Sequence, residues 1–136
     1  MKQIFVSGNG NTSFSDFLKY YHPHLETLVN EEDTYFILAD FRGIDVLSME
    51  FLKTRTSNVK IYHIGEKPRY FPDKFKTLVK NWTLLAGFTS DNERDDTAIK
   101  DCTHFLAIDF NSDEFRKSGT QKNIDNCILL GKISIL

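Results

Sequence analysis

The sequence has few of the features that mark a disulfide scaffold, a repetitive chain or a membrane protein. Its 136 residues include only two cysteines, Cys102 and Cys127, which are too few for a disulfide framework and form no C-x-x-C pair. No internal repeat or low-complexity segment is present. No apolar stretch approaches the roughly 20 residues of a membrane-spanning helix. These absences predict a protein without a membrane partner that works in a reducing compartment.

An excess of basic charge is also missing. Seventeen Lys and Arg residues stand against nineteen Asp and Glu, giving a net charge of −2. Since sequence-independent nucleic-acid binding depends on a basic surface, we do not expect it here. The opening residues, MKQIFVSGNG, lack the long apolar segment of a signal peptide, which favours a cytoplasmic location.

What the chain does contain is enough apolar material for a folded core. Forty per cent of its residues are hydrophobic and 13% aromatic, with twelve phenylalanines. This composition excludes an intrinsically disordered chain. Because domains typically hold about 100–150 residues, we expect residues 1–136 to form one domain.

Apolar runs and helical spacing alternate along the chain. The runs predict strands, at residues 4–6, 35–39, 59–64, 82–85, 104–109 and 132–136. The spacing predicts helices between them, at residues 14–29 with a kink or break at Pro23, 43–52, 74–80, 90–102 and 119–131. The alternation indicates an α/β fold with a mainly parallel sheet covered by helices on both faces.

Polar residues gather directly after the predicted strands. Because the carboxyl ends of parallel strands share one edge, and ligands bind at that edge where strand order reverses, we expect a site there. The candidate ligand-binding residues are Ser7, Gly8, Asn9, Asp40, Arg42, Gly43, Asp45, Arg69, Arg94, Ser118, Gly119 and Thr120.

Two short motifs among these candidates favour phosphate. The sequence Ser7-Gly8-Asn9-Gly10 follows a strand and could present backbone amides to an anion, although a simple βα turn explains it equally well. Ser118-Gly119-Thr120 opens the last helix, where small residues and the helix dipole favour an anion. Ordinary helix capping is the alternative interpretation of this second motif.

Charged residues cluster at two of the predicted helix starts. Asp40 lies where dinucleotide-binding folds place a ribose-binding acid, and Asp45 could serve the same purpose or merely complement the helix dipole. Arg42 is unfavourable near a helix N-terminus unless a carboxylate or a bound anion pairs with it. Arg94 with Asp95 forms a similar group. We find no metal-ligand spacing, Walker loop or nucleophile elbow, and we expect neither a metal nor a cofactor.

The order of these motifs resembles that of the YspA-like branch of the SLOG superfamily. The resemblance is carried by ILADFRGIDVLSMEFLKTRTSNVKIYHIGEKPR (Ile37–Arg69), GFTSDNERDDTAIKDCTHFLAIDF (Gly87–Phe110) and SGTQKNIDNCILLGKISI (Ser118–Ile135), with IFVSGNG as the first strand and loop. It implies a Rossmann-like three-layer α/β/α sandwich of roughly five or six mostly parallel strands. It also implies binding of a nucleotide or nucleotide-derived ligand.

Some relatives of this superfamily are enzymes, namely the LOG phosphoribohydrolases and the nucleoside deoxyribosyltransferases. The sequence departs from these enzymes at one position that matters for catalysis. Those carry a Glu shortly after the Gly-Thr pair, whereas Gly119-Thr120 is followed by Gln121-Lys122-Asn123. We therefore expect a module that senses or sequesters a nucleotide, with a homodimer as one assembly open to it. The alternatives are an N-glycoside hydrolase or transferase using Asp45, Asp95 or Asp109, and a protein-interaction domain whose pocket is filled by aromatic side chains.

Overall fold

Six parallel strands form a single sheet in the computed structural model, which describes residues 1–136. Their order across the sheet is β4-β3-β2-β1-β5-β6. The strands are β1 Lys2–Gly8, β2 Thr34–Ala39, β3 Val59–Ile64, β4 Thr83–Phe88, β5 His104–Ile108 and β6 Ile133–Ser134. The prediction of an α/β fold with a parallel sheet is confirmed.

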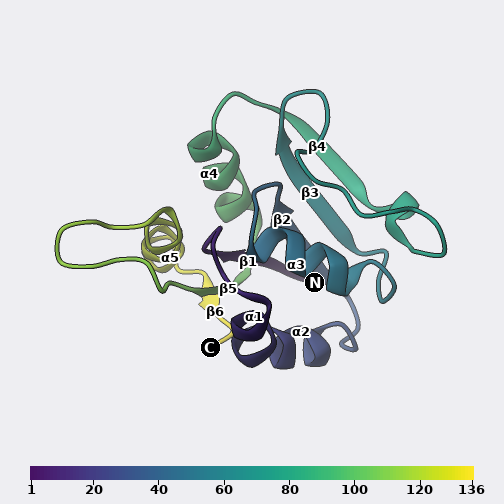
Figure 1. Cartoon of the computed structure of the whole chain (residues 1–136), viewed down its shortest axis with the longest axis horizontal. Coiled ribbons are helices and arrows are strands. Elements are labelled where there is room, and N and C mark those ends of the chain that lie inside the picture. The colour runs from purple at the N-terminus through teal and green to yellow at the C-terminus, as the bar shows by residue number, and fades with distance from the viewer.

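Helices cover both faces of this sheet, making a Rossmann-like three-layer sandwich (Figure 1). The helices are α1 Phe14–Tyr20, α2 His22–Leu28, α3 Ile44–Leu52, α4 Asp91–Asp101 and α5 Gly119–Leu129, with a short 3₁₀ turn, η1, at Val79–Asn81. The first three pack on one face, and α4 and α5 pack on the other.

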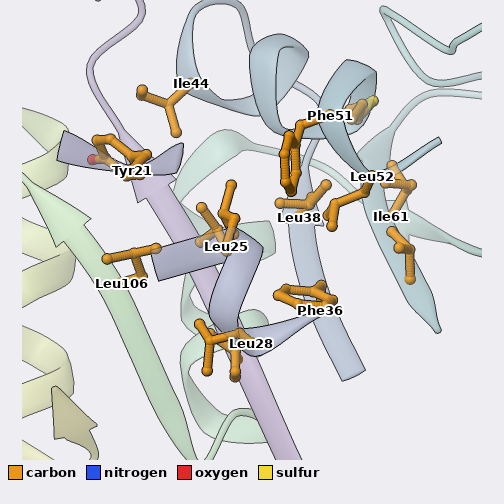
Figure 2. Packing of buried hydrophobic residues seen from close by; sticks show 14 of the residues in the cluster. Tyr21, Leu25, Leu28, Phe36, Leu38, Ile44, Phe51, Leu52, Ile61 and Leu106 are labelled. Carbon is orange, nitrogen blue, oxygen red and sulfur yellow. The ribbon is translucent and has the colours of Figure 1, made fainter. Parts of the chain in front are cut away.

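The central strands are apolar throughout because both of their faces are buried. In β1, Ile4 and Val6 enter the core beneath α1, α2 and α3, while Phe5 between them enters the core beneath α4 and α5. Figure 2 shows the first core, where Tyr21 and Leu25 lie over the same sheet face as Leu106. This core fixes α1 and α2 against the sheet.

Short-range sequence signals explain several helix boundaries. The Ser90 hydroxyl accepts the Glu93 amide at 3.1 Å, and the Ser118 hydroxyl accepts the Gln121 amide at 3.0 Å. Both are N-cap hydrogen bonds, which stabilise a helix start. Pro23 occupies the first turn of α2, so the predicted helix 14–29 is two abutting helices. Gly131, with φ of 73°, follows the end of α5 as predicted.

The predicted helix 74–80 is wrong. Lys76 adopts a left-handed conformation with φ of 54°, and the Asp73 carboxylate accepts the Phe75 amide in a turn. Only η1 forms in this part of the chain. The strand after it runs further than predicted, to Phe88, through a register shift against β3 between Tyr62 and Ile64.

None of the helices has the length and apolar character that crossing a bilayer requires. A polar pocket lies at the carboxyl edge of the sheet, where the loops after β1, β2 and β5 meet.

Candidate functional site

The strand order reverses between β1 and β5, and a pocket of about 450 Å³ lies at their carboxyl ends. We call it the switch-point pocket. In a parallel sheet this is the expected position for a ligand. Its volume lies within the range of about 300–1,000 Å³ that is typical of small-molecule sites. Only two of its lining residues, Ala39 and Phe41, are hydrophobic, so it is a polar pocket.

Tyr21 holds β1 and β5 in place beneath this pocket. Its buried hydroxyl donates to the Ser7 carbonyl at 2.8 Å and accepts the Ile108 amide at 2.9 Å. A Cβ atom at Gly8 would lie 2.6 Å from the Tyr21 hydroxyl oxygen. Gly8 is therefore required for packing under the pocket, in addition to any contact with an anion.

Asn9 joins the loop after β1 to the loop after β5. Its side-chain nitrogen donates to the Asp109 carboxylate at 2.9 Å, and its side-chain oxygen accepts the Phe110 amide at 2.8 Å. The amide also reaches the Thr120 hydroxyl at 3.3 Å. The two loops and the start of α5 therefore form one hydrogen-bonded unit.

Asp109 is the centre of that unit. Its carboxylate also accepts the Ser118 hydroxyl at 2.5 Å and the Ser112 amide at 3.0 Å. Burial opposes its ionisation, but the hydrogen bonds from Ser112, Ser118 and Asn9 outweigh burial and hold the pKa of Asp109 well below its ordinary value. Asp109 does not line the pocket. Asp109, one of the three candidate catalytic acids, here joins the two loops to the start of α5.

The start of α3 needs a glycine. Gly43 adopts φ of 73°, and a Cβ atom there would lie 2.7 Å from the backbone of Gly10. This close approach brings the loop after β1 against α3, and the backbone carbonyl oxygen of Asn9 accepts the Ile44 amide. Gly43, a predicted ligand-binding residue, thus shapes the pocket and is not among its lining residues.

Asp45 is buried in the first turn of α3 and lines the pocket. One carboxylate oxygen accepts the Phe41 amide at 3.0 Å, and the other has no hydrogen-bond partner in the protein. Burial raises the pKa of Asp45 to about 7, with the charges of Asp95 and Asp40 adding to the effect while the Phe41 amide and Arg94 oppose it. Near neutral pH this group is therefore both a hydrogen-bond donor and an acceptor.

Asp40 lies beside two positive charges. Its fully buried carboxylate forms ion pairs with the Arg94 guanidinium at 2.9 Å and with the Arg69 guanidinium at 3.1 Å. Burial opposes its ionisation, but the hydrogen bonds and charges of these two arginines hold the pKa of Asp40 below its ordinary value. Neither Asp40 nor Arg69 lines the pocket. Asp40 and Arg69, both predicted to bind a ligand, are thus paired with each other outside the pocket lining.

Arg94 extends this ion pair into the pocket. It is almost fully buried and also contacts Asp91 at 2.7 Å and Asp95 at 2.9 Å. Asp95 in turn accepts the Asn123 side-chain amide at 3.0 Å. Arg94 therefore holds the acids of α4 in position, and its charge is already balanced.

Two other arginines at the pocket have no such balance. Arg42 and Arg116 both line it, and neither forms an ion pair. The Arg42 guanidinium lies 5.3 Å from the ring centroid of Phe41, a favourable cation–π distance. Pairing of Arg42 with Asp40 or Asp45, which the sequence left open, does not occur.

Ten of the candidate residues predicted from the sequence converge on the switch-point pocket. They come from the β1 loop, the starts of α3 and α4, and the start of α5: Ser7, Gly8, Asn9, Arg42, Asp45, Arg94, Asp95, Ser118, Gly119 and Thr120. Four others do not line it: Asp40, Gly43, Arg69 and Asp109. No three His, Cys, Asp or Glu side chains are grouped in a way that would hold a metal ion.

The sequence reasoning missed three lining residues with distinctive chemistry, Phe41, Arg116 and Asn123. Phe41 stands between Asp40 and Arg42 just after the apolar strand, and no local signal distinguishes it from a core residue. Arg116 precedes the Ser-Gly-Thr motif by two residues, and its proximity to that motif was the available signal. The sequence analysis noted Asn123 only because it lies where related enzymes carry a Glu.

No protein-family model matches this chain, and neither a curated protein nor a solved structure shows significant similarity to it. Functional arguments therefore come from the geometry of the switch-point pocket.

Proposed function

We propose that this chain is a nucleotide-binding module of the SLOG type, which senses or sequesters a nucleotide or nucleotide derivative. The proposal is supported by the distribution of charge in the switch-point pocket. Arg42, Arg116 and the first amides of α5 favour an anion, while Asp45 and Asp95 favour hydroxyl groups. A phosphate joined to a sugar has both requirements. The cytoplasm, where nucleotides are abundant, is the compartment that this function implies.

The observation that carries the proposal is the presence of two unpaired arginines and a partly unsatisfied buried carboxyl in one pocket. Arg42 and Arg116 have no carboxylate partner, and one oxygen of Asp45 has no donor. Both arginines are exposed and therefore free to pair with a ligand anion, and the free oxygen of Asp45 is available for a hydrogen bond with a ligand. The pocket holds one aromatic residue, Phe41, so it is not filled by aromatic side chains as the interaction-domain alternative requires.

Calorimetry with AMP, GMP, CMP and UMP, and with the matching nucleosides, tests this function. We expect at least one nucleotide to bind and its nucleoside to bind more weakly. Arg42→Ala and Arg116→Ala should each weaken nucleotide binding by about tenfold, which corresponds to about 1.4 kcal/mol. Arg55→Ala, outside the pocket, is the matched control. Absence of binding by every nucleotide would refute the proposal.

Gly119→Val tests the anion position more locally. A Cβ atom at Gly119 meets no atom within 4 Å and its φ is not positive, so the fold should tolerate valine. The larger side chain should nevertheless occupy the space against the α5 amides and abolish nucleotide binding. Thr120→Ala should cost less, about 1 kcal/mol for one hydroxyl hydrogen bond. Lys100→Val, on an exposed position of α4, controls for adding a β-branched residue to a helix.

A second candidate function is hydrolysis of a nucleotide N-glycosidic bond, and Asp45 is the observation that favours it. With a pKa raised to about 7 by burial, Asp45 is suited to act as a general acid at neutral pH. In this reaction Asp45 would protonate the departing base nitrogen as the C–N bond breaks, water would add to the sugar carbon, and the proton that this water releases would restore the acid. Chromatography of nucleotide incubations should then reveal free base, and Asp45→Asn should abolish its release. Binding without release of base favours the module.

A further inference from the structure

The sheet has two free edges, β6 and β4, and the β4 edge is the longer one. β6 has two residues, whereas β4 has six and pairs only with β3. Four residues of β4 are exposed, namely Thr83, Leu84, Ala86 and Gly87. β4 therefore presents an open strand edge to its surroundings (Figure 1).

The backbone along this edge lacks partners. All hydrogen bonds of residues 83–88 belong to the ladder with β3, and no side chain or loop bonds to them. An edge strand presents a row of amides and carbonyls on the side away from its neighbour, and these groups can pair with a further strand. The outward side of β4 is such a row.

β4 also lacks the features that usually keep an edge strand from pairing with other chains, which are charged side chains and proline. The sequence NWTLLAGFTS, from Asn81 to Ser90, contains neither. Leu84, 45% exposed, places an apolar side chain at the edge. A register shift opposite Tyr62 and Ile64 leaves Thr83–Leu85 as the regular part of the strand. The edge is thus suited to a short extended segment.

The residues that lead into β4 indicate the charge of that segment. Lys74, Lys76 and Lys80 are exposed there, and none of them forms an ion pair. Asp73 is the one acid among them, and its carboxylate accepts the Phe75 amide. Three lysines against one aspartate give this stretch a net charge of +2, although the whole chain carries −2. The amino end of β4 therefore favours a negatively charged partner.

A second copy of the chain does not meet this requirement. In an antiparallel pair of β4 strands, the lysines of one copy would face the acids that follow β4 in the other. Those acids are already bonded, Asp91 to Arg69 and Arg94, and Glu93 to the Thr89 hydroxyl. The β4 edge also offers a single large exposed hydrophobic side chain, which is little against the roughly 1,000 Å² that a stable interface buries.

We propose that the β4 edge binds an extended acidic segment of another protein, which adds to the sheet as a further strand. Backbone hydrogen bonds along β4 supply the pairing, and Lys74, Lys76 and Lys80 select an acidic sequence. Because antiparallel pairing is the more stable, the acids lie toward the carboxyl end of the bound segment. Residues 83–88 do not line the switch-point pocket, so this inference does not depend on the proposed nucleotide binding.

Fluorescence anisotropy with three labelled synthetic peptides tests the inference. The first peptide alternates valine with threonine and ends in three glutamates. The second ends in three lysines instead, and the third is the first with its central backbone amides N-methylated, which prevents strand pairing. The acidic peptide should bind at least tenfold more tightly than either of the others at low ionic strength. Absence of binding by the acidic peptide, or equal binding by either control peptide, would overturn the inference.

A variant of β4 locates the binding surface. Leu84→Glu should weaken binding of the acidic peptide at least tenfold, because it places a like charge at the edge. Leu129→Glu, at an 81% exposed leucine of α5, is the matched control and should leave the affinity unchanged. Circular dichroism controls for folding, and unchanged affinity in a folded Leu84→Glu variant would overturn the location.

A lysine variant tests the charge preference and does not depend on whether Leu84→Glu folds. Lys74→Ala combined with Lys80→Ala should lower the affinity for the acidic peptide about tenfold, whereas Lys122→Ala on α5 should not change it. Equal affinity of the double variant and the unmodified protein would overturn the role of these lysines. A dimer that sedimentation equilibrium detects and that Leu84→Glu dissociates would overturn the proposal in favour of a second copy.

Discussion

Two aspartates of the site titrate in opposite directions because their neighbours differ. Asp40 contacts two arginines, so its charged form is favoured. Asp45 accepts one backbone amide and faces other acids, so burial dominates and its neutral form is favoured. Asp40 is therefore a fixed negative charge paired with arginines outside the pocket lining, whereas Asp45 lines the pocket and changes protonation near neutral pH.

The raised pKa of Asp45 predicts a pH-dependent stability. Its folded-state pKa of about 7 exceeds the value of about 3.9 expected in the unfolded chain. The folded state therefore holds the proton more tightly, and this contribution to stability is lost as the pH rises from about 4 through 7. Asp45→Asn keeps an acceptor for the Phe41 amide but removes the charge. It should stabilise the protein at pH 8, by on the order of 2–4 kcal/mol, and much less at pH 5.

Urea unfolding of both proteins at pH 5 and pH 8 measures this difference. The control is Asp96→Asn, because Asp96 is exposed and forms no ion pair. Asp16 does not serve as a control, because it lies in the first turn of α1. Asp96→Asn should shift stability equally at the two pH values. A constant effect of Asp45→Asn at both would contradict the assigned protonation.

At the scale of elements, Tyr21 connects the α1–α2 pair to the carboxyl ends of β1 and β5. Its hydroxyl is buried and bonded to both strands. Tyr21→Phe preserves the ring but leaves the Ile108 amide and the Ser7 carbonyl without that partner. We expect a loss of about 1–3 kcal/mol in the free energy of unfolding, together with weaker nucleotide binding, because the strand ends frame the pocket. Tyr20→Phe is the matched control, and equal stability of the two variants would contradict this role.

The ion pairs of Asp40 connect β2 to α4 and to the loop after β3. Asp40→Asn would remove the fully buried partner of Arg94, whose side chain is 4% exposed, and leave Arg94 with Asp91 and Asp95. Removing one member of a buried pair typically costs about 3–5 kcal/mol, and because two acids remain we expect a loss of about 3 kcal/mol by chemical denaturation. Arg69→Ala should cost less because its side chain is 43% exposed. Since the pKa of Asp40 is lowered on folding, its contribution should disappear as the pH falls below about 4.

The elements that the sequence predicted well are those with strong local signals. The strand 59–64 agrees with β3, and Pro23 separates α1 from α2 as its missing amide requires. The segment before β4 was predicted poorly because long-range packing determines it. The Trp82 indole donates to the Thr56 carbonyl at 2.9 Å, a contact between residues far apart in the sequence. No periodicity in the segment itself reports that contact.

At the scale of the whole molecule, the alternation of strands and helices predicted the edge that holds the site, since all parallel strands end there. It did not predict which charged groups remain available at that edge. Asp40 and Arg69 have motif-like positions, yet they pair with each other across 29 residues. Arg42 remains unpaired although two acids are near it in the sequence. Which charged groups pair depends on how loops from different strands meet. Local sequence patterns do not contain this information.

The order of the sheet also predicts how the molecule opens. β1 lies between β2 and β5, and its residues Ile4 and Val6 are fully buried, whereas β6 is a two-residue edge strand that is exposed. Because amides exchange by local opening at edges and by global unfolding at the centre, native-state hydrogen exchange should be slowest in β1 and β2. The amides of Ile133 and Ile135, which bond to Thr103 and Phe105, should exchange at least 100-fold faster, on the order of a 3 kcal/mol lower opening free energy. Exchange in β6 as slow as in β1 would contradict this hierarchy and indicate that the edge is covered in solution.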